Sequence, residues 1–188
     1  MAKKLSEMSL EELWRLFPIR LTKNQPCWRT WYGDERDFLC KILPKTVKIH
    51  HIGSTAIGLI WAKPIVDILV EIPQGDELSG YKTILIHNGY LCMAESEKGL
   101  SFNKGYTEDG FAERVFHLHL RYRGDNDELY FRDYLMENPE IAQGYERLKL
   151  SLWKEYEFNR DGYTNAKTEF VQTYTEKAKQ LYKNRYAE

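Results

Sequence analysis

The sequence predicts an α/β protein of the α+β type, in which helices flank a mixed β-sheet and a helical part follows it. Three stretches predict the sheet, because they are short runs rich in apolar or alternating side chains: residues 47–52, 65–72 and 115–123. The segments before and after these runs instead repeat apolar residues at helical spacing and carry helix start and stop signals. We therefore expect a sheet core between two helical parts.

The length of 188 residues suits a single domain, since domains average about 150 residues. We expect one domain over residues 1–188. Its N-terminal helical part would cover residues 1–44, its sheet core residues 45–124 and its C-terminal helices residues 125–188. No internal repeat or low-complexity linker divides it.

Composition narrows the range of partners. The 27 basic residues nearly balance the 28 acidic ones, so no overall field attracts nucleic acid, and we do not expect it as a partner. No apolar run reaches the ~20 residues of a membrane span, and no secretory signal is present. The three cysteines are widely spaced, which is typical of reduced thiols. These features predict a soluble cytoplasmic protein without a membrane partner; they do not decide its oligomeric state.

The N-terminal part shows two helix patterns. Ser9 and Glu12 form a capping-box pattern ahead of a short helix that Pro18 ends. A second helix is expected over residues 28–43, with Pro44 after it.

The central motif of the chain is the turn His51-Ile52-Gly53-Ser54-Thr55 after the first strand. Gly53 permits a backbone geometry that a Cβ would resist, and Ser54 and Thr55 are suited to cap a helical turn over residues 56–61. Backbone N–H groups at such a turn point outward and can cradle an anion. We therefore predict that Gly53, Ser54 and Thr55 bind phosphate.

The next strand, residues 65–72, places a carboxylate beside this turn. Alternation puts Asp67, Leu69 and Glu71 on one face. Glu71 lies roughly 13 Å along the strand from Asp67, too far to share one ion, so we expect a structural role near the solvated strand end. Lys63, just before the strand, is either a phosphate contact or an ordinary loop lysine.

The third strand has an apolar back and a polar front. His117, His119, Arg121 and Arg123 alternate along one face of residues 115–123. Histidine binds first-row metals well but is a poor ligand for Mg²⁺, which prefers oxygen. Together with Asp67 the two histidines form a candidate metal set, although paired histidines are also common as structural groups.

The stretch between these strands is less regular. A helix is expected over residues 78–88 and a strand start at residues 90–93. The polar, glycine-containing residues 96–110 lack periodicity and predict a mobile hairpin or loop.

The C-terminal part predicts three helices. The first covers residues 128–137, the second begins at Pro139, and the last is capped by Thr164 after a turn at residues 160–162. Three basic residues on these helices are further candidates for phosphate contacts, or they are solvated surface groups: Arg132, Lys149 and Lys167.

Several of these motifs together resemble one family. The stretch HIGSTAIGLIWAKPIVDILVEI, with FRDYL, NPEIAQGYERLK and YTNAKTEF further on, closely resembles the GrpB family (UPF0157 type) over most of the chain. That family is similar to the polymerase-β-like nucleotidyltransferases, whose hallmark is a Gly-Ser turn followed on the next strand by Asp, a hydrophobic residue and a second acid. Here Leu69 stands where the second acid is expected.

The resemblance implies a nucleotidyltransferase-like fold that binds a nucleotide or another phosphorylated small molecule. It further implies a divalent metal, Mg²⁺ or Mn²⁺, with Asp67 as the catalytic residue and metal ligand. Two alternatives stay open. One is a degenerate module that binds nucleotide or phosphate without catalysis. The other is a metal-dependent hydrolase that uses Asp67, His117 and His119.

Overall fold

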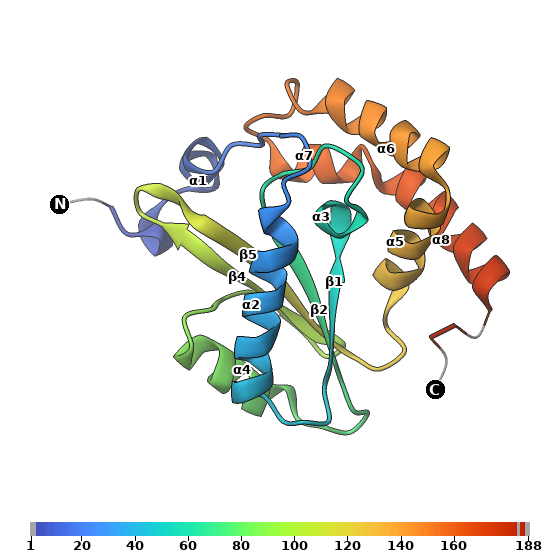
Figure 1. Cartoon of the computed structure of the whole chain (residues 1–188). Coiled ribbons are helices and arrows are strands. Elements are labelled where there is room, and N and C mark those ends of the chain that lie inside the picture. The colour runs from blue at the N-terminus through green and yellow to red at the C-terminus, as the bar shows by residue number, and fades with distance from the viewer. Residues whose placement is uncertain (1–2, 184, 187–188) are drawn as a thin grey trace.

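The computed structural model describes residues 3–183 and 185–186. Its elements succeed one another as shown in Figure 1: a 3-10 helix η1 (Leu5–Glu7), α1 (Leu10–Leu16), α2 (Cys27–Ile42), β1 (Lys48–Ile52), α3 (Gly53–Ile57), β2 (Val66–Ile72), α4 (Leu78–His87), β3 (Leu91–Ser96), β4 (Gly99–Thr107), β5 (Gly110–Tyr122), α5 (Asp127–Glu137), α6 (Pro139–Leu152), α7 (Arg160–Asn165) and α8 (Thr168–Tyr182). The expected succession, in which helices precede and follow a sheet core, is confirmed.

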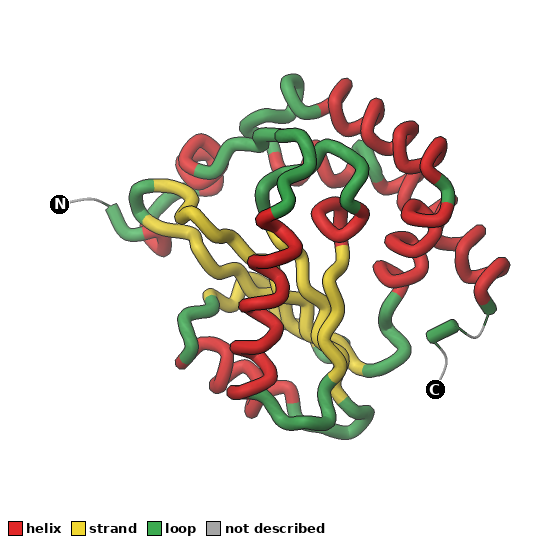
Figure 2. The backbone as a smooth tube through the Cα atoms, in the orientation of Figure 1, coloured by secondary structure: helices red, strands yellow, loops and turns green. Residues whose placement is uncertain are grey.

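The strands form one mixed sheet in the order β1-β2-β5-β4-β3 (Figure 2). β2 and β5 run parallel and every other pair is antiparallel. The parallel register pairs Asp67 with His117 and Leu69 with His119. The three predicted strands therefore belong to one sheet, and the carboxylate and the histidines lie on adjacent strands.

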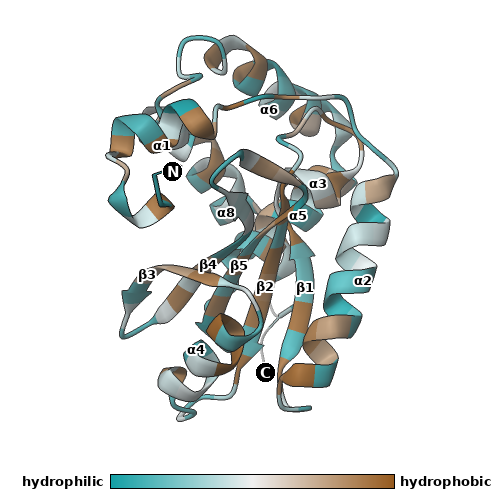
Figure 3. Cartoon of the chain, turned by 90° about the vertical axis from the view of Figure 1, so that its left-hand side faces the viewer, coloured by the Kyte–Doolittle hydropathy of each residue, from teal (hydrophilic) through white to brown (hydrophobic). Residues whose placement is uncertain are grey.

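The two faces of the sheet have different neighbours. One face carries Ile68, Val70 and Leu118, which pack with buried residues of α2 and α4 in the main core. β2 is brown over much of its length in Figure 3, in keeping with its mostly hydrophobic residues. The other face carries Asp67 and the histidines and turns toward α5 and the helices beyond it. The alternation in β2 and β5 thus separates a core face from a site face.

Of the two alternatives expected over residues 96–110, the structure has the hairpin and not the loop. These residues form the β3–β4 turn and the strand β4, whose partners are β3 and β5. Leu100 and Phe102 are about 1% exposed and belong to the main core. The apolar and polar residues of β4 do not alternate regularly in the sequence, for two reasons. The polar residue Asn103 is buried, and a register shift lies between Lys104 and Tyr106.

The turn after β1 is itself the helix α3, which begins earlier than expected. Its N-cap is Ile52, so Ser54 and Thr55 lie inside the helix and are not its caps. The helix ends at Ile57, where Gly58 adopts the left-handed conformation that commonly terminates helices. The short helix reflects this glycine, which the expected 56–61 turn had included.

The C-terminal part has one helix more than expected. The segment expected as a turn at residues 160–162 begins α7, and Lys167 rather than Thr164 is the N-cap of α8. Within the described residues, no helix combines the length and apolar character needed to cross a membrane.

Candidate functional site

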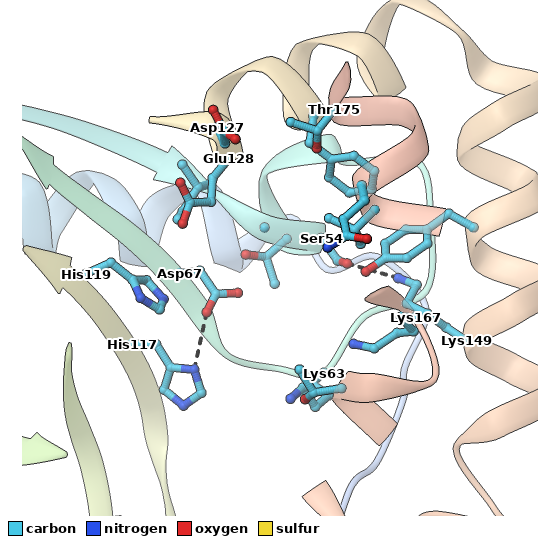
Figure 4. Close-up of a pocket in the computed structure, with 18 of the residues that line it drawn as sticks. Ser54, Lys63, Asp67, His117, His119, Asp127, Glu128, Lys149, Lys167 and Thr175 are labelled. Atoms are coloured by element: carbon cyan, nitrogen blue, oxygen red, sulfur yellow. Dashed lines mark hydrogen bonds and ion pairs between the residues drawn. The ribbon is translucent and has the colours of Figure 1, made fainter. Parts of the chain in front are cut away.

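A pocket of about 1020 Å³ opens on the site face of the sheet (Figure 4). Its floor comes from the end of β1, from α3, and from β2 and β5, and its walls come from α5, α6, α7 and α8. The predicted site residues all line it: Gly53, Ser54, Thr55, Lys63, Asp67, His117 and His119. The fold therefore brings together residues that the sequence spreads over more than sixty positions.

Asp67 lies against the backbone of Gly53. Gly53 has φ +70°, and a Cβ built on it would lie 2.4 Å from Asp67 Oδ2. Glycine is therefore required here for two reasons: the backbone is left-handed, and the Asp67 carboxylate leaves no room for a Cβ. The close approach predicted for this glycine exists, and its partner in the structure is Asp67.

A hydrogen-bonded chain holds the other side of this carboxylate. Asp67 Oδ1 lies 3.2 Å from His117 Nδ1, and His117 Nε2 lies 2.7 Å from the hydroxyl of Tyr106. Arg160 on α7 donates to the same hydroxyl at 2.9 Å. Tyr106 therefore accepts from Arg160 and donates to His117, whose Nδ1–H then donates to Asp67.

The pKa values agree with a neutral His117 that donates to an ionised Asp67. Burial acts to raise the pKa of Asp67, but the hydrogen bond from His117 and the nearby positive charge of Lys63 outweigh it and hold that pKa below its usual value. Burial lowers the pKa of His117, and lowers that of His119 to about 4. Asp67 is therefore ionised at neutral pH while both histidines are neutral.

The predicted metal set is brought together, but its donors are not free to bind an ion as they stand. Both ring nitrogens of His117 are used within the protein. In the described part of the chain, no three His, Cys, Asp or Glu side chains are grouped as a metal site. A Mg²⁺ ion prefers oxygen ligands, and the set offers a single carboxylate. The residues therefore do not fit the two-ion magnesium centre that the resemblance implied.

Leu69, which stands at the position of the second acid, is also buried away from the pocket. Leu69 is fully buried and packs with Ile52 and with Leu129 of α5. A carboxylate there would point into an apolar cluster, where an unpaired charge is strongly disfavoured. The helix α5 thus covers the place where the second ligand would stand.

Three lysines form the basic wall of the pocket: Lys63, Lys149 and Lys167. Lys149, 2% exposed, donates to Ser54 Oγ at 3.1 Å and to the carbonyl oxygen of Trp61. Lys63 and Lys167 are half-buried, and both lie near the ring of Tyr163, with Lys167 Nζ 4.1 Å from its centroid. Within residues 3–183 and 185–186, neither ammonium forms an ion pair with a carboxylate. Figure 4 shows Lys149 next to Ser54, with Lys167 and then Lys63 below it in the view.

Their crowding lowers the affinity of all three lysines for protons. Burial, with Arg160 nearby, lowers the pKa of Lys63 to about 8. Burial and the charge of Lys167 lower the pKa of Lys149 to about 7, and burial and Lys63 lower that of Lys167 to about 7. Asp67 alone offsets these effects at Lys63 and Lys167 only in part. The negative charges of Asp67 and Glu146 therefore offset the positive charge of the wall only in part.

The side chains of Thr55 on α3 and Glu71 on β2 are both bonded within the protein. Thr55 Oγ1 lies 3.0 Å from His51 Nε2 and is thus used within the protein. Glu71 is structural as expected, but it is 4% exposed rather than near solvent. Sequence reasoning missed Tyr106 and Arg160, because the former lies in the stretch interpreted as a loop and the latter in one interpreted as a turn.

Taken together, the fold and the pocket define an α/β protein whose mixed sheet presents one carboxylate to a wall of lysines. Comparisons with known proteins identify its family. The profile of the GrpB protein family matches residues 18–177. The chain belongs to the GrpB family.

Curated relatives support this assignment. The UPF0157 protein YqkA of Bacillus subtilis is 30% identical over 97% of this chain, and the chain spans 54% of that relative's length. The glutamate-rich protein GrpB of Alkalihalophilus pseudofirmus is 33% identical over 81% of this chain and 91% of its own length.

A solved structure of a family member has the same fold. The crystal structure of conserved protein GrpB from Enterococcus faecalis has a TM-score of 0.74 at 29% identity, covering 87% of this chain and 99% of that one. The Cid1 poly(U) polymerase with MgGTP bound is a more distant structural neighbour, with a TM-score of 0.49 at 12% identity, covering 75% of this chain and 44% of the polymerase. No function is transferred from that similarity.

Proposed function

We propose that this pocket binds a phosphorylated small molecule of the nucleotide class, and that it does so as a binding site without catalysis. The observation that carries the proposal is the basic wall, because Lys63 and Lys167 are half-buried ammonium groups without a carboxylate partner in the described part of the chain. Burying positive charges together costs free energy, which Asp67 offsets only in part, and an anionic ligand would reduce that cost further.

The neighbours of the wall suit a phosphate. Ser54 presents a hydroxyl that already accepts from Lys149 and can donate its own proton to a ligand oxygen. Tyr163 lines the same pocket, and its buried hydroxyl lacks a hydrogen-bond partner among the described residues. A buried polar atom left unpaired is uncommon, and a ligand oxygen would satisfy it. The predicted phosphate role of Gly53, Ser54, Thr55 and Lys63 is part of this proposal.

Isothermal titration of ATP and of pyrophosphate tests the proposal. Replacing Lys167 by glutamine keeps a polar side chain but removes a charge, so we expect the affinity to fall about tenfold, or ~1.4 kcal/mol. Lys177→Gln is the matched control, because Lys177 is an exposed lysine on the same helix. Its affinity should stay within about twofold of the wild type. Absence of binding by the wild-type protein, or equal losses in both variants, would refute the proposal.

Nucleotidyl transfer is the second candidate, favoured by one observation: Asp67 is ionised and lies in the pocket near the basic wall. Metal-assisted transfer needs the developing charge to be stabilised by ions held on several ligands. A turnover assay over the four common ribonucleoside triphosphates with Mn²⁺ decides, since product formed by the wild type and abolished by Asp67→Asn would establish transfer. The hydrolase alternative requires His117 to leave both Asp67 and Tyr106 before it could bind an ion.

A further inference from the structure

Lys149 is a buried lysine whose partners are a serine hydroxyl and a carbonyl group. Its side chain is 2% exposed, and its Nζ donates to Ser54 Oγ at 3.1 Å and to the carbonyl oxygen of Trp61. Glu146, on the same helix, accepts instead from the backbone N–H of Trp61 at 2.7 Å. Among the residues that the structure describes, no carboxylate forms an ion pair with Lys149. Its proton is therefore held by neutral oxygens, which bind it less strongly than a carboxylate would.

This environment favours the free amine. Burial and the charge of Lys167 lower the pKa of Lys149 to about 7, and Glu146 offsets them only in part. At neutral pH about half of the molecules then carry an uncharged Lys149. In that form one N–H can still donate to Trp61, while the lone pair can accept the hydroxyl proton of Ser54. The distance of 3.1 Å lies within the reach of about 2.6–3.2 Å that joins a nucleophile to its general base.

The surroundings of Ser54 indicate which electrophile it would meet. Ser54 lines the pocket together with Lys63 and Lys167, and Figure 4 shows these lysines beyond the bond between Ser54 and Lys149. A phosphate that leaves an electrophile would find these two ammonium groups on the same wall. Carbon is a better centre for the attack than phosphorus, because the oxygens of a phosphoryl group carry negative charge that repels the developing alkoxide.

From this arrangement we infer that Ser54 is a nucleophile with Lys149 as its general base, and that it accepts the acyl group of acyl phosphates, the mixed anhydrides of a carboxylic acid and a phosphate. Ser54 Oγ forms a bond to the carbonyl carbon while its proton passes to Lys149 Nζ. The bond from that carbon to the phosphate oxygen breaks, and the phosphate leaves with the electron pair. Lys149 then releases the proton to solvent, and an acyl ester remains on Ser54.

The inference goes beyond the proposed function, in which a ligand binds without a covalent step. It depends on the contacts of Ser54 and Lys149 and not on the overall charge of the pocket. That charge is mixed, because three carboxylates of α5 and α8 line the pocket as well: Asp127, Glu128 and Glu176.

Acetyl phosphate is the probe for this reaction. After incubation with the wild-type protein, peptide mass spectrometry should find an acetyl ester on Ser54. Alkaline hydroxylamine should remove that ester and leave acetyl amides of lysines in place, so the two kinds of product are distinguished. Ser151→Ala is the matched control, because Ser151 is an exposed serine on the helix of Lys149 and lies outside the pocket. It should leave the ester on Ser54 at the wild-type level.

A variant of Lys149 tests the base. Lys149→Arg keeps a positive charge and hydrogen-bond donors but does not release a proton near neutral pH. We expect ester formation to slow by about 100-fold or more, which is the usual contribution of a general base. Circular dichroism and pyrophosphate titration show whether the variant keeps its fold and its phosphate contacts.

The pH profile of the wild type tests the same role without a substitution. Ester formation at saturating acetyl phosphate should rise about tenfold from pH 6 to pH 8, because Lys149 loses its proton around pH 7. Saturation removes the effect of weaker binding as Lys63 and Lys167 lose their protons over the same range. Tyr145, whose ring centroid lies 4.9 Å from Lys149 Nζ, stays neutral because burial raises the pKa of its hydroxyl.

The outcomes separate the inference from the proposed function. Pyrophosphate binding without an ester on Ser54 overturns the inference and leaves the proposed function standing. Equal rates in the wild type and a folded Lys149→Arg variant, or a flat wild-type profile between pH 6 and pH 8, also overturn it. Ester formation that excess pyrophosphate does not slow overturns the assignment of acyl phosphates as the substrate class. An ester on Ser54 in a protein that does not bind pyrophosphate supports the nucleophile and overturns the proposed function.

Discussion

Asp67 and Glu71 lie on the same strand and the same face, four residues apart, yet they have opposite roles. Asp67 keeps over a quarter of its side-chain surface exposed and faces the pocket. Glu71 is buried, and its carboxylate accepts from Asn126 Nδ2 at 2.9 Å, lies 2.8 Å from His50 Nε2 and accepts weakly from the N–H of Gly124. The difference comes from the elements that cover the two ends of β2.

The comparison shows that a strand's alternation places a carboxylate on a face but does not assign its role. At Glu71 the chain supplies donors from β1 and from the start of α5, so the group joins elements of the fold together. At Asp67 the donor is a histidine on the neighbouring strand, the other oxygen lies against Gly53, and the carboxylate faces the pocket. A carboxylate is available to a ligand where the fold leaves its surroundings incomplete.

The largest expected effect tests Glu71. Glu71→Ala leaves the amide of Asn126 and the ring of His50 without their partner, so we expect a loss of about 2–4 kcal/mol in the free energy of unfolding. Asp67→Ala, the matched variant, should change that free energy by less than about 1 kcal/mol, because it also relieves burial of the carboxylate. Urea denaturation measures both. Equal losses of unfolding free energy in the two variants would mean that both carboxylates have a structural role.

A smaller effect tests how closely Asp67 is held to the turn. Gly53→Ala places a Cβ at a left-handed position and against the carboxylate, so we expect a loss of about 2 kcal/mol. In the double variant Gly53→Ala/Asp67→Ala the carboxylate is gone, and part of that loss should be recovered, giving a coupling of about 0.5–1 kcal/mol. Strict additivity in thermal or urea unfolding would show that only the backbone conformation matters.

The smallest effect is the pH dependence of the basic wall. The folded-state pKa values of Lys149 and Lys167 are lowered to about 7, so above pH 7 the unfolded chain holds protons that the folded chain has released. Stability of the ligand-free protein should therefore rise as the pH increases from 7 toward 9. Polyphosphate affinity should fall over the same range, because the anion requires protonated lysines. Unfolding curves and titrations at several pH values measure the two opposite slopes; Lys149→Met/Lys167→Met should flatten both.

More of the fold than of the candidate site could be predicted from the sequence. Alternation identified β2 and β5, and proline and glycine signals identified most helix ends, because these features act over a few residues. The strand β4 was not predicted, because it is buried through its pairing with β3 and β5 and its own residues show no clear alternation. The pocket's floor was predicted from the motif around Gly53 and Asp67.

The sequence offered the lysines of the basic wall as separate candidates, but it did not predict that they lie together. Lys149 and Lys167 were candidates on helices, but nothing local distinguishes them from Lys177, which is exposed. The chain from Arg160 through Tyr106 to His117 joins three elements 54 and 11 residues apart, and no short-range pattern signals such contacts. Leu69 was recognised as a missing acid, whereas its burial beneath Leu129 depends on where α5 docks.

The contact between Lys149 and Ser54 spans 95 residues of sequence, and this has a consequence for protein synthesis. Chains leave the ribosome from the N-terminus, and domains begin to fold as they emerge. All five strands, with Asp67 and His117, are made before any part of α6, α7 or α8. A nascent chain at that stage holds its carboxylate on the sheet with Lys63 but without Lys149 and Lys167. The ability to capture an anion therefore arises only after translation has passed Lys167, well after the sheet can form.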